Sequence, residues 1–224
     1  MTGLLEYDLG RGARAFTAGR DVELPCAVVQ PHQTHSAIVA RVDRPDLKRE
    51  DLDGVDALVT DLPGVAIGVR TADCIPVLLY DPVHRAAGAV HSGWRGTVNM
   101  IVKKAVLEMC HLFGSRPEDI RALIGPGIGV DSFQVGEDVA LTFKESGFPI
   151  DRVWSFRGAK KDGSMEGGHH IDLKECVRFS LEECGVNPVD ISVSDIDTYT
   201  DGRFYSARRE GISCGRNINV IKLI

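Results

Sequence analysis

The segment TADCIPVLLYDPVHRAAGAVHSGWRGT, residues 71–97, combines two strongly apolar runs with four chemically reactive side chains. The runs at residues 75–81 and 86–91 flank a short turn and predict two buried, neighbouring strands. The reactive side chains lie at the ends of these runs: Asp73, Cys74, His91 and Arg95. A carboxylate, a thiol, an imidazole and a guanidinium are unusual beside core strands, and their placement indicates a functional site there.

Short β-type runs on either side of this segment predict further strands. They occupy residues 26–30, 36–42, 55–60, 65–70, 190–199 and 217–224. The runs before residue 92 lie too close together for helical crossovers to join all of them. We therefore expect a mixed or antiparallel sheet and not a doubly wound parallel one.

The clearest helix pattern follows, in TVNMIVKKAVLEMCHLFG, residues 97–114, where apolar residues recur every three or four positions. Thr97 is expected to cap the start of this helix, and Gly114 to end it. Further helices are predicted at 135–147 and from Asp172, and a mobile glycine-rich loop at 157–170. Helices set among runs of strands predict an α+β fold, with mixed β-sheets in a layered sandwich and flanking helices.

Length and composition exclude several classes of protein. A chain of 224 residues without an obvious linker predicts one domain, 1–224. The formal net charge of -6 and the lack of a basic run argue against a nucleic-acid partner. We find no signal peptide and no membrane-length apolar run. Six cysteines in a chain of this length do not form a disulfide scaffold, so we expect a cytoplasmic protein, and we expect a monomer.

Three residues at strand edges form a candidate metal site: His35, Cys74 and His91. Imidazole and thiolate are preferred zinc ligands, and three protein ligands leave a fourth position open for water or substrate. Their spacing matches no zinc finger. From the spacing alone, a buried thiol and two ordinary polar histidines are the favoured interpretation.

The motif HSGWRGT, residues 91–97, suits an anion, because a helix start offers free N–H groups and Arg95 adds a bidentate fork. A plain strand-to-helix connection with a surface arginine is the alternative. Gly93 and Gln33 complete the predicted substrate- or phosphate-binding set. Asp73 is predicted to join the site only if the backbone turns there, since neighbouring side chains of a strand point to opposite faces.

The chain resembles a known family in five motifs that occur in the expected order: HQTH, TADCIPVLLYDP, AVHSGWRGT, IGPGIGVDSFQVGEDV and RFYSARREGISCGR. This family is the bacterial YfiH-like proteins, also called the multicopper polyphenol oxidase (laccase) family, and the resemblance runs from about His32 to the C-terminus. It implies an α+β fold similar to that of certain bacterial toxins with Cys-His hydrolase sites. Where many relatives have CTY, this chain has DTY, with Asp197, which bears on metal preference and on any role of a second thiol.

The resemblance implies a zinc enzyme that cleaves adenosine, inosine or methylthioadenosine with phosphate and deaminates adenosine. Its metal ligands map onto His35, Cys74 and His91. For the phosphorolysis step we further predict Arg95 as the phosphate ligand and Asp73 as general acid/base. Two alternatives stay open. One is a copper-dependent polyphenol oxidase, since a His₂Cys centre also binds Cu²⁺. The other is a metal-free Cys/His hydrolase acting on cell-wall precursors, with Cys74 as nucleophile and His91 as base.

Overall fold

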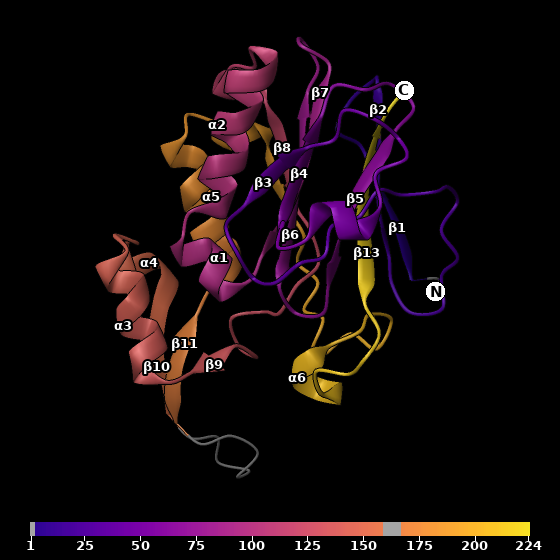
Figure 1. Ribbon diagram of the computed structural model, residues 1–224. Coiled ribbons are helices and arrows are strands. Elements are labelled where there is room, and N and C mark those ends of the chain that lie inside the picture. Colours follow the sequence, from indigo (N-terminus) through magenta and orange to yellow (C-terminus); the bar gives the residue numbers. More distant parts are fainter. Residues whose placement is uncertain (1–2, 159–166) are drawn as a thin grey trace.

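The computed structural model describes residues 3–158 and 167–224, which form three β-sheets and flanking helices (Figure 1). The largest sheet contains, in spatial order, β12 (Ile191–Val193), β8 (Arg121–Ile124), β6 (Ile75–Asp81), β7 (Ala86–Ser92), β4 (Ala57–Thr60) and β3 (Val39–Arg41). The second contains β1 (Leu4–Tyr7), β2 (Ala13–Ala18), β13 (Asn217–Leu223) and β5 (Ala66–Thr71). The third contains β10 (Trp154–Arg157), β11 (Gly168–Ile171) and β9 (Gln134–Val135).

Six α-helices accompany the sheets in the described part of the chain: α1 (Trp94–Val98), α2 (Ile101–Phe113), α3 (Glu137–Glu145), α4 (Ile150–Val153), α5 (Leu173–Glu183) and α6 (Ala207–Glu210). Helices α2 and α5 cover one face of the six-stranded sheet, and the four-stranded sheet lies against its other face (Figure 1). None of the described helices is both long and apolar enough to cross a membrane.

Both faces of strand β6 are buried, which explains its continuous apolar sequence. Ile75, Val77 and Leu79 belong to the core formed with the helices. Leu78 and Tyr80 alternate with them and belong to the core between the two larger sheets. Strands covered on both faces need apolar residues at successive positions, so this hairpin forms the centre of the layered structure.

The expected α+β fold with mixed sheets is confirmed. In the six-stranded sheet, β12 pairs with β8 and β3 pairs with β4 in parallel, whereas the pairs between β4, β7, β6 and β8 are antiparallel. The predicted hairpin of residues 75–81 and 86–91 is also present, and Val77 lies opposite Val90.

Some predicted elements differ from the structure. Residues 26–30 make only an isolated bridge through Val29, and the run at 36–42 is a strand only over β3. Strands β1 and β2 were not predicted, because their short runs carry several polar residues. The predicted loop 157–170 is strand at both ends, in β10 and β11, and its residues 159–166 lie outside the described part.

The helix predicted at 97–114 is two helices, α1 and α2. The amide of Asn99 donates a hydrogen bond to the Arg95 carbonyl at 2.8 Å, and Met100 follows with φ of 59°, so the chain leaves the helical path. Thr97 is not a cap: it lies inside α1, where its hydroxyl donates to the Gly93 carbonyl. The predicted stop at Gly114 is confirmed by its φ of 72°.

Candidate metal centre and adjoining cavity

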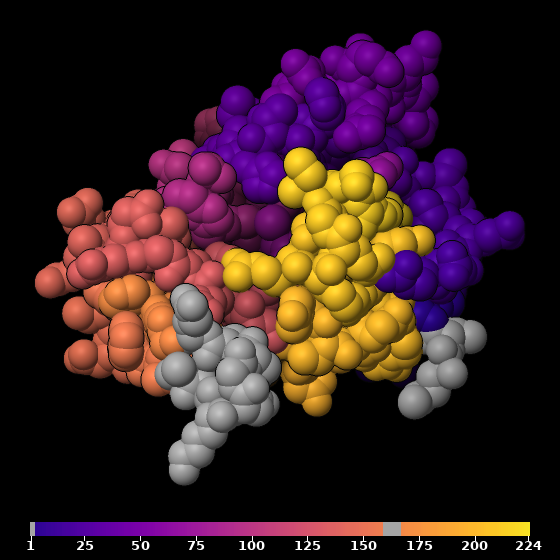
Figure 2. Space-filling view, turned by 90° about the horizontal axis from the view of Figure 1, so that it is seen from below, coloured from indigo at the N-terminus to yellow at the C-terminus, as the bar shows by residue number. Residues whose placement is uncertain are grey.

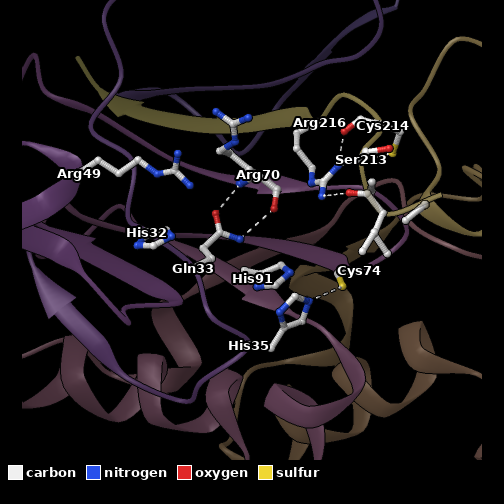
Figure 3. Close-up of a pocket in the computed structure, with 13 residues that line it drawn as sticks. His32, Gln33, His35, Arg49, Arg70, Cys74, His91, Ser213, Cys214 and Arg216 are labelled. Atoms are coloured by element: carbon white, nitrogen blue, oxygen red, sulfur yellow. Dashed lines mark hydrogen bonds between the residues drawn. The ribbon is translucent and has the colours of Figure 1, made fainter. Parts of the chain in front are cut away.

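The structure brings His35, Cys74 and His91 together, although they are far apart in the sequence. One ligand atom from each lies within 4.8 Å of the others, and Nε2 of His35 lies 3.8 Å from Sγ of Cys74 (Figure 3). Ligand atoms of a tetrahedral zinc ion lie roughly 3.5 Å apart, given its usual bond lengths. Cys74 directly precedes β6 and His91 lies near the end of β7, so the register of this hairpin places two of the three residues side by side.

A fourth residue, Asp56, holds the group in position. It is fully buried, and its carboxylate accepts backbone hydrogen bonds from Thr34, His35 and Ser36 at 2.9–3.0 Å. Its Oδ1 also lies 2.6 Å from Nδ1 of His91. The Asp56 carboxylate therefore fixes the backbone of the loop that carries His35 and also orients the ring of His91. Sequence analysis missed Asp56; an aspartate at the start of the buried run 55–60 was its only signal.

Gly93, a predicted substrate-binding residue, lies directly against two of the candidate metal ligands. It is the N-cap residue of α1, and a Cβ atom there would lie 3.0 Å from both Sγ of Cys74 and Cδ2 of His35. Only glycine lets the backbone approach these two side chains so closely. Gly93 is thus part of the wall behind the candidate metal site.

The two neighbouring histidines favour the thiolate form of Cys74. Burial alone would raise the pKa of Cys74, but the charges and hydrogen bonds of His91 and His35 outweigh it and lower this pKa to about 6. Burial alone would lower the pKa of His91, but Cys74 and Asp56 outweigh it and raise this pKa to about 9. In the metal-free protein, Cys74 and His91 therefore form a thiolate–imidazolium pair near neutral pH, and a thiolate is the form that binds metals.

The three residues line one side of a cavity of about 570 Å³. The other lining residues come from the loop and turn before β4, from the end of β5, and from the C-terminal segment: His32, Gln33, Arg49, Arg70, Ala72, Ala207, Ile212, Ser213, Cys214 and Arg216. In Figure 2 the surface is hollowed where the C-terminal segment meets the segments from the first third of the chain. The cavity size suits a small-molecule ligand.

Gln33 lines this cavity, but both polar atoms of its side-chain amide are hydrogen-bonded to the backbone of Arg70. Its Oε1 accepts from the Arg70 N–H and its Nε2 donates to the Arg70 carbonyl, both at 2.8 Å (Figure 3). Gln33 thus fixes the part of β5 that carries Arg70. Its role in substrate binding stays a prediction.

Asp73 and Arg95 do not line the cavity in the described structure. Asp73 has φ of 85°, and its buried carboxylate accepts from the Thr198 hydroxyl at 2.8 Å and from the Arg208 N–H at 2.7 Å. Arg95 is exposed, and its guanidinium lies 4.4 Å from the centre of the Trp94 ring.

Asp197, the residue in place of the commoner cysteine, also lies outside the cavity lining of the described residues. Its carboxylate accepts from the Ser132 hydroxyl at 2.5 Å and from the Tyr199 N–H at 2.9 Å. These contacts give Asp197 a role in fixing the turn that follows it. All six cysteines are free thiols, as the sequence predicted.

Comparison with known proteins places the chain in a family. The family described as multi-copper polyphenol oxidoreductase laccase matches residues 13–224. A protein of Bacteroides thetaiotaomicron named purine nucleoside phosphorylase is 40% identical over 208 residues, which are 90% of this chain and 75% of the relative. A protein of an unknown prokaryotic organism named adenosine deaminase RL5 is 39% identical over 201 residues, 87% of this chain and 74% of the relative.

Solved structures show the same fold. The hypothetical protein YfiH of Bacillus licheniformis is 31% identical, with a TM-score of 0.79 over 88% of this chain and 74% of that one. Protein NMB0706 of Neisseria meningitidis, 24% identical, has a TM-score of 0.80 over 99% of each chain. The resemblance noted from the motifs is thereby confirmed, and the chain belongs to the multi-copper polyphenol oxidoreductase laccase family of YfiH-like proteins.

Proposed function

We propose that this protein is a zinc-dependent enzyme acting on purine nucleosides, with His35, Cys74 and His91 as the metal ligands. The proposal is carried by the convergence of these side chains at a cavity, in a chain 40% identical to a protein named purine nucleoside phosphorylase. Two reactions are proposed: phosphorolysis of adenosine, inosine or methylthioadenosine, and deamination of adenosine. The names of the relatives support both reaction classes. A cytoplasmic monomer remains the expected form.

The donor set fits a zinc ion. Two imidazoles and a thiolate are common zinc ligands, and three protein ligands leave a position that substrate can reach from the cavity. Because Nδ1 of His91 is bound to Asp56, its Nε2 is left for the metal, as in many carboxylate–histidine–zinc arrangements. When bound, such an ion supplies Lewis-acid activation of water or of a substrate oxygen at neutral pH.

Side chains of the protein must bind the nucleoside and supply the proton that the leaving purine takes up. In phosphorolysis a phosphate oxygen bonds to C1′ of the ribose, the C1′–N9 bond breaks, and the purine leaves with a proton. For this step the sequence predicted Asp73 as proton donor and Arg95 as phosphate ligand, but neither lines the cavity in the described structure. Each side chain would have to leave its present partners to reach the cavity.

Two other functions each have one observation in their favour. Copper-dependent polyphenol oxidation follows the description of the family and the affinity of a His₂Cys group for copper. A metal-free hydrolase acting on cell-wall precursors, with Cys74 as nucleophile and His91 as base, follows the lowered pKa of Cys74. The first requires copper in protein purified without added copper. The second requires activity that survives a chelator.

The test combines metal analysis with turnover of inosine plus phosphate and of adenosine. We expect about one zinc per chain, and loss of both metal and turnover in Cys74→Ser and His91→Ala. His111→Ala, at an exposed position on α2, is the matched control and should retain both. Full turnover by a correctly folded Cys74→Ser protein that lacks metal would contradict the proposal.

A further inference from the structure

Three arginines line the cavity beside the candidate metal group. Arg49 lies in a short 3₁₀ turn at Arg49–Leu52, Arg70 lies in β5, and Arg216 directly precedes β13. In Figure 3 these arginines lie along one side of the cavity, and His35, Cys74 and His91 lie along the other. Three separate segments of the chain thus each place a guanidinium group at the same cavity.

These three arginines have no carboxylate partner among the described residues. The residues that line the cavity include no Asp or Glu, and within residues 3–158 and 167–224 none of the three arginines forms an ion pair. Other arginines of the chain do have such partners, for example Arg20 with Glu210 at 2.7 Å. Arg49 is exposed and Arg70 and Arg216 are half-buried, so water screens part of their mutual repulsion, and a bound anion would offset the remainder.

The neighbouring groups hold the arginines in place without neutralising them. Nε of Arg49 donates to the Pro31 carbonyl at 3.3 Å. The Arg216 guanidinium donates to the Ile212 carbonyl at 2.8 Å and also to the carbonyls of Cys214 and Gly215. Gln33 clamps the backbone of Arg70 on both sides, and no hydrogen bond of the Arg70 guanidinium occurs among the described residues. Burial, followed by the charges of Arg49 and Arg216, lowers the pKa of Arg70, which agrees with three guanidiniums close enough to interact.

We infer that Arg49, Arg70 and Arg216 form the phosphate subsite of this cavity, with Arg70 at its centre. Guanidiniums bind phosphate oxygens through paired, charge-assisted hydrogen bonds, and several around one site suit a dianion. A phosphate held there shares the cavity with a nucleoside at the metal group. This inference rests on the proposed function, and it assigns phosphate binding to residues other than Arg95.

Substrate kinetics provide the first test, because phosphorolysis consumes phosphate and deamination does not. Arg70→Gln and Arg216→Gln should each raise the KM for phosphate about tenfold or more, the loss expected for one charged hydrogen bond. The kcat/KM for adenosine deamination should change less than twofold. Arg44→Gln, at an exposed position, is the matched control. An unchanged KM for phosphate in both variants, or an equal loss in deamination, would overturn the inference.

Direct binding provides a second test that does not need turnover. Calorimetric titration of the metal-loaded protein with inorganic phosphate should show saturable binding that Arg70→Gln weakens about tenfold and Arg95→Gln leaves unchanged. A weakening by Arg95→Gln alone would overturn the inference. If the wild type binds phosphate in this way but turns over no nucleoside, the subsite stands and the proposed function fails.

A third titration distinguishes the two sources of a phosphate group. Inosine 5′-monophosphate and inosine are compared on the wild type and on Arg70→Gln. An advantage of the nucleotide over inosine that disappears in Arg70→Gln assigns the subsite to a phosphate ester of the substrate. Competition of inorganic phosphate without such an advantage assigns it to free phosphate, the result we expect.

Discussion

Nδ1 of His91 lies 2.6 Å from Oδ1 of Asp56, and the same carboxylate accepts the backbone N–H of His35. A single buried group thus fixes the ring of one candidate ligand and the loop of another. The backbone N–H groups of Thr34, His35 and Ser36 all donate to this carboxylate, and His35 has φ of 63°. The geometry of the candidate metal site therefore depends on Asp56, which is not among the three candidate ligands.

Replacement of this carboxylate should weaken metal binding. Asp56→Asn keeps the shape but loses the negative charge opposite His91, and we expect the metal affinity to fall about 10- to 100-fold. Competition with a chromophoric chelator measures this. Asp53→Asn, whose side chain is 71% exposed and contacts His32, should bind metal as the wild type does. Equal affinities of Asp56→Asn and wild type would contradict the positioning role.

Gly93→Ala should disturb the metal group without unfolding the chain. The new Cβ would lie 3.0 Å from Cys74 Sγ and from His35 Cδ2, so one or both side chains must shift. We expect weaker metal binding, with a melting temperature within a few degrees of the wild type. Gly202→Ala is the control, because a Cβ there has no described neighbour within 4 Å and its φ is ordinary. Unaltered metal affinity in Gly93→Ala would show that Cys74 and His35 can move aside without loss of metal binding.

Alkylation of Cys74 should depend on both pH and metal. Its pKa of about 6 in the metal-free protein makes it mostly thiolate at pH 7, whereas burial raises the pKa of Cys184 to about 11. In chelator-treated protein, the iodoacetamide rate at Cys74 should rise through pH 6 and level off by pH 7 to 8. Peptide mass spectrometry follows each thiol separately. Metal-loaded protein should react much more slowly, since a coordinated thiolate is protected; equal rates would favour the metal-free hydrolase.

The buried contact between Asp73 and Thr198 should contribute to stability. Asp73→Asn is the suitable variant, because asparagine tolerates a positive φ, and Thr198→Val removes the donor hydroxyl. Each change should lower the free energy of unfolding by about 1–3 kcal/mol. In a double-mutant cycle measured by urea denaturation, the two losses should be less than additive. Strict additivity would mean that the charge of Asp73 adds no stability through this hydrogen bond.

The pH profile of adenosine deamination then separates the two roles of Asp73. If Asp73 only positions the loop, Asp73→Asn lowers the rate without moving the pH profile. A general acid or base role would remove one limb of the profile. Because both oxygens of Asp73 are occupied by Thr198 and Arg208, we expect the unmoved profile.

Local sequence patterns predicted strands best where both faces are buried, because such strands need an unbroken run of apolar residues. Strands β6 and β7 were predicted within one residue, since every position in them is buried. The end of α2 at Gly114 and the start of α5 after Asp172, whose side chain accepts the Glu175 N–H, follow from local chemistry. Helix α1 ends before α2 because the backbone of Met100 has φ of 59°, a local conformation that apolar periodicity does not report.

The amino-acid sequence by itself determined the central hairpin, the α+β class and the three residue types able to bind a metal, because each depends on neighbours along the chain. Only the tertiary structure decided what surrounds them: Asp56 behind His91, Gly93 against Cys74, and Arg49, Arg70 and Arg216 around the cavity. The sequence prediction placed phosphate at Arg95, four residues after His91, although Arg70 stands equally close to Cys74 in the chain. The arginines that share the cavity come from distant segments, and only the register of packed sheets brings such segments together.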